Sequence, residues 1–330
     1  MSIYLNNPWK PKKHTIIRED SLAQQLHEQG FGIQNLIDQD TIAKIQKLFD
    51  EHHNLTDANG GMFYSVYSQD LVYRKKMHDS LAEILRPITD KICKDYKMML
   101  NSFVVKISGP ESEFYLHQDT TGLDEWKYSP LSLWIPLQDV DESNGCLGLI
   151  PCSQHFFSPY RSISFPSPFD HIQTEVKAYL QPQKMKVGEV LVFDNRVLHH
   201  SYKNESGKVR VALICGLFPE EAQMQTCHKE AYVCGGEVEL INQEDDFLLK
   251  GTNFLIDCQK RPSMGFSVGF VKDPFSPIEK EDFVALCNRY ELKNSTMENS
   301  TAPTHCKMIA EPVLTETKAP SLWEKIKGLF

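Results

Sequence analysis

Apolar residues recur at helical spacing along the first hundred residues of the chain. The pattern predicts a break at residues 30–33 and three helices, over residues 21–26, about 40–53 and 80–96. We expect Asp40 or Thr41 to cap the second helix, and Pro87 to bend or shorten the third. The chain is therefore expected to begin with a helical layer.

From residue 99 onward, runs of apolar and β-branched residues replace the helical spacing. The pattern predicts strands over residues 103–107, 114–118, 131–137, 190–193 and 209–218. Turn signals separate them, notably Asn144-Gly145 and residues 204–207. Helices followed by many strands favour an α+β chain whose β part is a sandwich or barrel.

The pattern becomes weaker after residue 218. It indicates short strands near residues 237–241 and 266–271 and a helix over residues 278–290. Residues 293–305 are rich in Asn, Ser and Thr, which is typical of a linker. Residues 321–330 carry one apolar helical face, formed by Leu322, Trp323, Ile326, Leu329 and Phe330. We expect one domain over residues 1–292, and a linker with a short amphipathic helix over residues 293–330 that docks on its own domain, on a partner or on a membrane surface.

Composition narrows the class of protein. Lys and Arg number 35 against 44 Asp and Glu, a net charge of −9, which excludes the basic field of a nucleic-acid-binding protein. The longest apolar run, residues 211–218, is far short of the ~20 residues that cross a bilayer. The N-terminus shows no secretory pattern, so a cytoplasmic location is expected. The nine scattered cysteines favour reduced thiols over a disulfide framework.

Two histidines and one carboxylate stand out as candidate metal ligands. His117 and Asp119 are two positions apart, and on a strand such side chains emerge on the same face. This spacing has little weight alone, because His228-Lys229-Glu230 repeats it without a third ligand, and we expect that copy to be structural. A second predicted strand leads to His199, which would complete a two-histidine, one-carboxylate triad for non-haem Fe(II).

Arg210 is a candidate anchor for an anion. It interrupts the apolar run 209–218, and a guanidinium in a buried strand needs an anionic partner. A hairpin closing at residues 204–207 would return Arg210 to the residues before the turn, where it could bind one end of a dicarboxylate whose other end chelates the metal. Two alternatives stay open: His200 could replace His199 as the ligand, and Lys106 either reaches this region or, as we expect, faces water.

Several further motifs accompany these residues in a fixed order. They are residues 134–140 (Trp-Ile-Pro-Leu-Gln-Asp-Val), residues 144–147 (Asn-Gly-Cys-Leu), Pro151-Cys152-Ser153, and His199-His200-Ser201 followed by Asn204, Ser206 and Arg210. Together with His117-Gln118-Asp119, they make the chain similar to the phytanoyl-CoA dioxygenase family of Fe(II)/2-oxoglutarate-dependent oxygenases, from about residue 31 to residue 218. One departure is Pro151-Cys152-Ser153-Gln154-His155, where the family shows Pro-Gly-Ser-His, so the substrate wall beside it is expected to differ.

The resemblance implies a double-stranded β-helix, or jelly roll, over residues 31–218, flanked by the N-terminal helices and elaborated by residues 219–292. It implies that His117, Asp119 and His199 bind Fe(II), that Arg210 holds the distal carboxylate of the cosubstrate 2-oxoglutarate, and that Trp134 and Ser201 line its pocket.

The implied reaction consumes O₂ and 2-oxoglutarate, releases succinate and CO₂, and hydroxylates an unactivated C–H bond of a small molecule. A free metabolite, an amino acid and a carrier-tethered intermediate stay open as substrates, and so do desaturation, cyclisation and epimerisation as outcomes. The alternative from another class is a non-catalytic jelly-roll protein that binds a metal or a small ligand.

Overall fold

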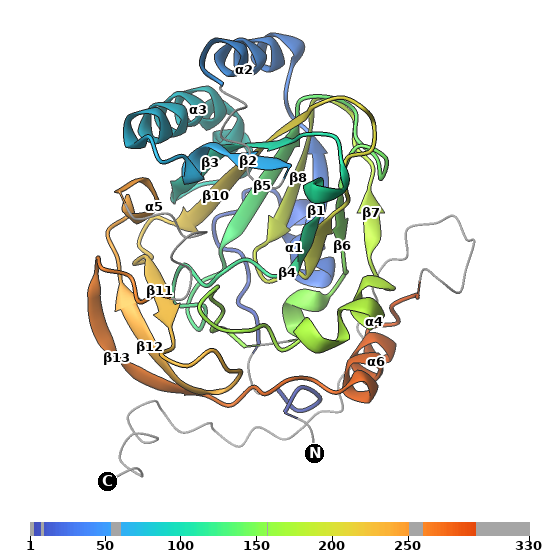
Figure 1. The fold of residues 1–330 in the computed structure, drawn as a ribbon, viewed down its shortest axis with the longest axis vertical. Helices are drawn as coiled ribbons and strands as arrows, with labels where there is room; N and C mark the ends of the chain where they lie inside the picture. The colour runs from blue at the N-terminus through green and yellow to red at the C-terminus, as the bar shows by residue number, and fades with distance from the viewer. Residues whose placement is uncertain (1–2, 8–9, 54–60, 157, 251–259, 295–330) are drawn as a thin grey trace.

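Two antiparallel sheets lie at the centre of the computed structural model, which describes residues 3–7, 10–53, 61–156, 158–250 and 260–294 (Figure 1). The larger sheet contains, in spatial order, β1 (Phe31–Asn35), β8 (Glu189–Asp194), β5 (Leu131–Pro136), β10 (Arg210–Pro219), β3 (Tyr96–Lys106) and β2 (Met62–Tyr64). The smaller sheet contains β4 (Phe114–His117), β9 (His199–Ser201), β6 (Leu147–Leu149) and β7 (Gln181–Gln183).

The order in which the chain visits the two sheets defines the fold. Strands β3, β5, β8 and β10 are neighbours in the larger sheet, and β4, β6, β7 and β9 form the smaller one. The chain therefore crosses repeatedly between sheets, and the pairings β3 with β10 and β4 with β9 join strands far apart in sequence. This is the topology of a jelly roll. The expected α+β class and double-stranded β-helix core are confirmed.

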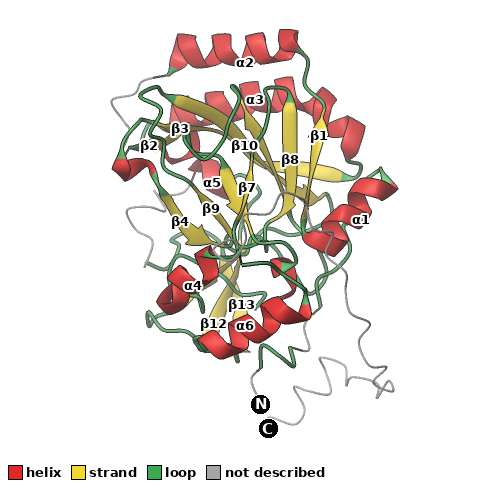
Figure 2. Cartoon of the chain, turned by 90° about the vertical axis from the view of Figure 1, so that its right-hand side faces the viewer, coloured by secondary structure: helices red, strands yellow, loops and turns green. Residues whose placement is uncertain are grey.

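Three helices cover the outer face of the larger sheet: α1 (Asp20–Gln29), α2 (Gln39–His52) and α3 (Leu71–Ile92) (Figure 2). Their apolar faces meet the sheet in one buried cluster that includes Leu22, Ile45 and Leu81 from the helices and Phe103 and Leu213 from the strands. The opposite face of the sheet packs on β6 through a second cluster, which contains Trp134 and Leu149. Both faces of the larger sheet are thus buried, which explains the unbroken apolar runs in its strands.

Helix boundaries differ from the sequence prediction by up to nine residues, and a cap explains two of the differences. The second helix is capped by Asp38, whose carboxylate accepts a hydrogen bond from the Thr41 amide, rather than by Asp40 or Thr41. The third begins about nine residues earlier than expected, because Asp70 caps it by accepting from the amides of Val72 and Tyr73. Pro87 lies inside that helix on its exposed side, where water can satisfy the carbonyl that loses its partner.

The chain beyond the jelly roll forms a second layer at one end of it. A three-stranded sheet consists of β11 (Gln225–His228), β12 (Gly236–Asn242) and β13 (Phe266–Asp273). The short helices α5 (Phe247–Lys250) and α6 (Lys280–Arg289) belong to the same part of the chain. The helix α4 (Gln173–Lys177) and the 3-10 turns at Ser65–Tyr67, Pro110–Ser112, Ser153–His155 and Asp170–Ile172 lie earlier, between elements of the jelly-roll region. The weak strand and helix signals after residue 218 therefore mark real elements.

A linker and a short helix are expected at the C-terminal end of the chain. The amphipathic helix expected over residues 321–330, and nearly all of the linker before it, lie outside the described residues. No described helix is both long enough and apolar enough to span a membrane.

Six described cysteines are free thiols, as expected, whereas Cys152 is disulfide-bonded and contradicts that expectation.

A buried ion pair fixes the turn between β8 and β9. Arg196 donates from Nε to Oδ1 of Asp194 at 2.7 Å and from Nη2 to Oδ2, and His14 Nε2 lies 2.9 Å from the same Oδ2. Burial alone raises the pKa of Asp194, but Arg196 and His14 outweigh it and hold that pKa well below its ordinary range. The Arg196 carbonyl accepts from the side chain of Gln118, so the turn is also tied to the segment between the first two candidate metal ligands.

We expect Asp194→Asn to lower the free energy of unfolding by about 3–5 kcal/mol, because it leaves the Arg196 guanidinium buried without its carboxylate. Urea denaturation at pH 7 measures the loss. The matched control is Asp139→Asn, which breaks a solvent-exposed pair with Lys186 at 2.8 Å and should change stability far less. Since the pKa of Asp194 is depressed in the folded state, the difference between wild type and Asp194→Asn should shrink as the pH falls below about 4. Equal losses in the two variants would contradict this role.

Candidate metal centre

The two candidate histidine ligands face each other across one strand pair. His117 ends β4, His199 begins β9, and the antiparallel register makes them direct partners. Their ring centroids are 4.1 Å apart. Two residues far apart in sequence therefore present imidazoles to one point because of strand pairing alone.

Each imidazole is oriented by its own backbone. Nδ1 of His117 lies 2.9 Å from the Tyr115 carbonyl, and Nδ1 of His199 lies 2.9 Å from the Val197 carbonyl. A carbonyl oxygen can only accept, so both Nδ1 atoms carry a proton, and each Nε2 is the ring nitrogen available to a metal. Burial, and after it the neighbouring His117, lowers the pKa of His199 to about 4, which keeps this ring neutral at physiological pH.

Asp119 supplies the carboxylate from just beyond the end of β4. Its Oδ1 lies 3.7 Å from Nε2 of His117 and 3.7 Å from Nε2 of His199. The potential ligand atoms of all three residues lie within 4.8 Å of one another. Burial raises the pKa of Asp119, but the two histidines outweigh it and the pKa lies below its ordinary value, so the carboxylate is ionised.

Hydrogen bonds also hold the second carboxylate oxygen and the backbone amide of Asp119. The Ser132 hydroxyl lies 3.3 Å from the second carboxylate oxygen and 3.0 Å from Oδ1 of Asn195. The Asp119 amide donates to the Asn195 carbonyl at 3.0 Å. Two imidazoles and one carboxylate form the donor set expected for a divalent first-row metal such as Fe(II). Within the described residues, no other group of three potential ligands converges in this way.

His200 points away from this site, as adjacent strand residues must. Its Nε2 lies 3.4 Å from Oε1 of Glu113, and its ring contacts Tyr202 edge-on at 5.1 Å. The geometry therefore favours His199 over the alternative ligand. The second His-x-acid pattern belongs to no group of three potential ligands within the described residues, and Lys229 between its members turns inward and pairs with Asp273 at 3.0 Å.

Arg210 approaches the site from the other sheet. It begins β10, which pairs with β3 and β5, whereas the strand before it, β9, pairs with β4 and β6. The expected hairpin is therefore wrong, because the chain crosses between sheets at this turn. The guanidinium is fully buried, lies 5.5 Å from the Trp134 ring, and donates from Nη1 to the Val104 carbonyl.

The remaining nitrogens of Arg210 have no protein partner. Nε and Nη2 are buried and make no hydrogen bond in the structure. Burial lowers the pKa of Arg210 only to about 10, so the side chain stays charged. A buried cation with two unused donors, side by side in one plane, is arranged to bind a carboxylate through two oxygens.

Lys106 does not face water as expected. It is fully buried, and its Nζ donates to the backbone carbonyls of Ser201 and Tyr202. Strand β3 is buried on both faces at this point, so the alternation that would expose one face is absent. Burial, and next the nearby Arg210, lowers the pKa of Lys106 to about 6, and its amine thus adds little positive charge beside Arg210 at neutral pH.

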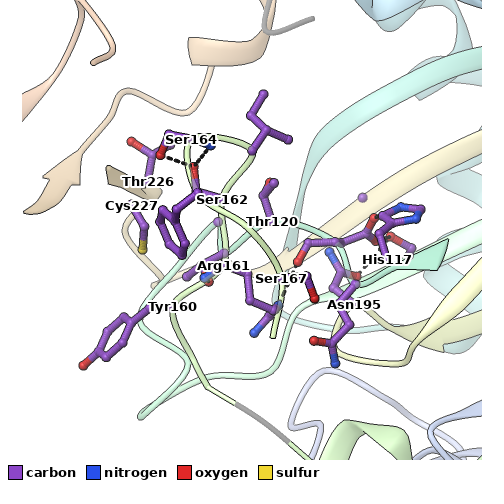
Figure 3. A pocket seen from close by; sticks show the side chains of 18 of the residues that line it. His117, Thr120, Tyr160, Arg161, Ser162, Ser164, Ser167, Asn195, Thr226 and Cys227 are labelled. Carbon is purple, nitrogen blue, oxygen red and sulfur yellow. Dashed lines mark hydrogen bonds and ion pairs between the residues drawn. The ribbon is translucent and has the colours of Figure 1, made fainter. Parts of the chain in front are cut away.

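All six predicted site residues line one cavity of about 810 Å³: His117, Asp119, Trp134, His199, Ser201 and Arg210. The cavity continues outward between the segment at residues 158–168 and the three-stranded sheet (Figure 3). Apolar side chains such as Met99, Phe218 and Phe247 line it together with hydroxyls such as Thr120 and Ser162. Lining residues come from several separate stretches of the chain, within residues 61–70, 120–130 and 153–169 and after residue 218.

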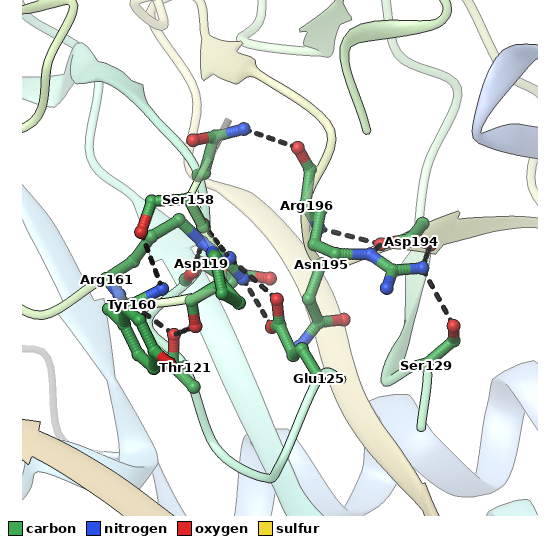
Figure 4. Close-up of polar contacts among 12 residues, drawn as sticks. Asp119, Thr121, Glu125, Ser129, Ser158, Tyr160, Arg161, Asp194, Asn195 and Arg196 are labelled. Carbon is green, nitrogen blue, oxygen red and sulfur yellow. Dashed lines mark hydrogen bonds and ion pairs between the residues drawn. The ribbon is translucent and has the colours of Figure 1, made fainter. Parts of the chain in front are cut away.

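A buried ion pair next to the metal centre was not predicted. Arg161 donates to both carboxylate oxygens of Glu125, at 2.8 and 2.6 Å, and its Nε donates to the Asp119 carbonyl at 2.9 Å (Figure 4). The two residues lie 36 positions apart in segments without a periodic pattern. Nothing in their spacing or in the neighbouring residues signals the contact.

Comparison with known proteins agrees with this geometry. The family model described as phytanoyl-CoA dioxygenase (PhyH) matches residues 26–212, which is more than half of the chain. The chain belongs to this family. The resemblance inferred from the sequence motifs is thus confirmed.

Individual members of the phytanoyl-CoA dioxygenase family match over shorter stretches. Phytanoyl-CoA dioxygenase 1 of Oryza sativa subsp. japonica is 32% identical over 115 residues, which cover 34% of this chain and 41% of that protein. Phytanoyl-CoA dioxygenase of Arabidopsis thaliana is 29% identical over 153 residues, covering 44% and 50%. The matched stretch thus spans half or less of the length of these relatives. Among solved structures, EctD from S. alaskensis matches 66% of this chain and 84% of its own, with 16% identity and a TM-score of 0.46.

We expect His199→Ala to weaken Co(II) binding more than about a hundredfold, because it would remove a candidate ligand rather than a supporting contact. His200→Ala should bind Co(II) within a few-fold of wild type, since that side chain faces Glu113 and Tyr202. Titration of the metal-free protein, followed by the visible absorbance of bound Co(II), measures both. The reverse ranking would transfer the ligand assignment to His200.

Proposed function

We propose that this protein is a non-haem Fe(II)- and 2-oxoglutarate-dependent dioxygenase that hydroxylates an unactivated C–H bond of a small metabolite. The observation that carries the proposal is one cavity that contains both the His117, Asp119 and His199 cluster and a buried Arg210 with two unused donors. Membership of the phytanoyl-CoA dioxygenase family supports the same reading.

The donor set fits the metal. Fe(II) prefers imidazole and carboxylate ligands, and His117, Asp119 and His199 offer two imidazole Nε2 atoms and one carboxylate oxygen. When bound, Fe(II) with 2-oxoglutarate and O₂ supplies the oxidising chemistry: one oxygen atom enters succinate as CO₂ is released, and the other enters the substrate C–H bond. The protein contributes ligand geometry, a site shielded from water and the placement of the substrate.

Arg210 fits the distal carboxylate of 2-oxoglutarate. Its free Nε and Nη2 would bind the two oxygens, while the Val104 carbonyl and the Trp134 ring keep the guanidinium in place. Trp134 would also form one wall of the cosubstrate pocket, and Ser201, whose hydroxyl donates to the Gly145 carbonyl at 3.3 Å, would lie at its edge.

The outer part of the cavity would hold the primary substrate. The whole cavity, including the metal centre and the cosubstrate site, has a volume of about 810 Å³, which is the size of a small-molecule site. The mixture of apolar and hydroxyl side chains fits a free metabolite, an amino acid and the reactive end of a carrier-tethered intermediate alike. The proposal is for hydroxylation; desaturation, cyclisation and epimerisation would use the same site and are distinguished by the product.

We expect the wild-type protein to convert 2-oxoglutarate into succinate when Fe(II), O₂ and ascorbate are supplied, slowly alone and faster with a substrate. Asp119→Ala should lose this turnover, because it removes the only anionic ligand. Quantifying succinate across a substrate panel makes the measurement. If wild type releases no more succinate than Asp119→Ala under any of these conditions, the chain is a non-catalytic binding protein.

We expect Arg210→Lys to raise the dissociation constant of 2-oxoglutarate roughly tenfold to hundredfold, which corresponds to about 1.5–3 kcal/mol for a charge-assisted hydrogen bond. Lysine keeps the charge but loses the planar fork. The measurement is an anaerobic titration of 2-oxoglutarate at saturating Fe(II), followed by the metal-to-ligand absorbance. Arg86→Lys, on the exposed face of α3, is the matched control and should bind like wild type. Equal constants in Arg210→Lys and wild type would remove Arg210 from the cosubstrate site.

A further inference from the structure

We infer that Arg161, held by Glu125, is a positioning residue for the metal ligand Asp119. This inference rests on the metal centre proposed above and assigns a role to two residues outside it. Arg161 Nε donates to the Asp119 carbonyl at 2.9 Å, and both terminal nitrogens donate to Glu125. The guanidinium thus links the backbone of a candidate metal ligand to the buried anion Glu125.

Asp119 needs this support because it lies outside the strand ladders. Strand β4 ends at His117, so the pairing that orients the two histidines does not extend to the carboxylate. Its peptide groups are instead held from two sides, by the Asn195 carbonyl at its amide and by Arg161 at its carbonyl. Removing one of these contacts would leave the direction of the side chain under weaker control.

The contacts of Arg161 tie three segments together. Its Nη1 also donates to the Ser158 carbonyl at 3.0 Å, its amide donates to Oγ1 of Thr121 at 2.8 Å, and its carbonyl accepts from the Thr121 amide at 2.9 Å. The ligand segment 119–121, the loop that carries Glu125 and the cavity wall 158–161 therefore meet at one side chain (Figure 4). Since Ser158, Tyr160 and Ser162 line the cavity, a molecule that displaces this wall would also act on Asp119.

The energetics favour a positioning role over simple stabilisation. Glu125 is 1% exposed and Arg161 8% exposed, and burying such a pair costs about as much desolvation free energy as the attraction returns. Apolar residues of similar volume could hold the wall equally well. What they could not supply is an N–H directed at the Asp119 carbonyl while both terminal nitrogens hold Glu125, and only arginine offers that fork.

The test compares two variants with a neighbouring buried ion pair as control. Arg161→Lys keeps the charge for Glu125 but loses the Nε donor to Asp119. The double variant Arg161→Met with Glu125→Leu replaces the pair by apolar side chains, so that folding does not depend on an unpaired charge. The control is Lys229→Met, which breaks the buried pair with Asp273; that pair also holds this wall, through Ser158 at 3.4 Å, but makes no hydrogen bond to Asp119.

The readouts are the dissociation constant of Co(II), the shape of its visible absorption band, and thermal unfolding, all measured on the full chain without substrate. We expect both Arg161 variants to bind Co(II) roughly tenfold to hundredfold more weakly than wild type and to show an altered band, in the range seen when supporting contacts of metal ligands are removed. Lys229→Met should unfold at a lower temperature yet keep the wild-type constant and band.

Each outcome decides between distinct claims. A folded Arg161→Lys and a folded double variant with wild-type Co(II) affinity and spectrum would overturn the inference while leaving the metal centre intact. The same loss of affinity in Lys229→Met would show that any weakening of the wall is sufficient, which also overturns it. Failure of both Arg161 variants to fold would assign the pair to the fold rather than to Asp119. Absence of Co(II) binding in wild type would instead contradict the proposed function itself.

Discussion

The antiparallel pairing of β4 with β9 is the constraint on which the rest of the site depends. Its register places His117 opposite His199, and the backbone carbonyls two residues before each histidine fix the tautomer and the ring direction. Every other element of the centre is arranged around that pair: Asp119 lies just beyond the strand end, and the turn fixed by Asp194 and Arg196 leads the chain into β9. A shift of one residue in this register would turn one imidazole to the opposite face.

The buried basic side chains of the core differ in how fully they are hydrogen-bonded. Arg196 is paired with Asp194, Arg161 with Glu125, and the Lys106 amine lies on two backbone carbonyls. Arg210 alone among these four keeps two buried nitrogens without a hydrogen bond. An unsatisfied buried cation costs free energy, so an anion that binds there would also stabilise the fold, in proportion to the logarithm of its concentration relative to its dissociation constant.

The sequence could reveal the parts of this structure that depend on local pattern. Long apolar strands such as β5 and β10 were predictable from their composition, and the candidate ligands from the spacing of His117, Asp119 and His199 together with flanking motifs. The three-residue strands β6 and β7 were not, because they are too short to show a period of two. Topology was also hidden: the expected hairpin before Arg210 and the exposed Lys106 were both wrong, since neither a sheet crossing nor burial on both faces has a local signal. The contact between Arg161 and Glu125 depends entirely on tertiary folding.

Two different parts of the chain line the cavity. The inner part, with the candidate ligands, belongs to the jelly roll, whereas part of the outer lining comes from β11 and from the loops around the three-stranded sheet, such as residues 260–264. That sheet shares no strand ladder with the other two and lies beyond the stretch matched by the family model. Changes in length, twist or side chains there can reshape the space above the metal without moving a ligand. The choice of substrate can therefore change while the arrangement of the metal ligands, which the pairing of β4 with β9 holds in place, stays the same.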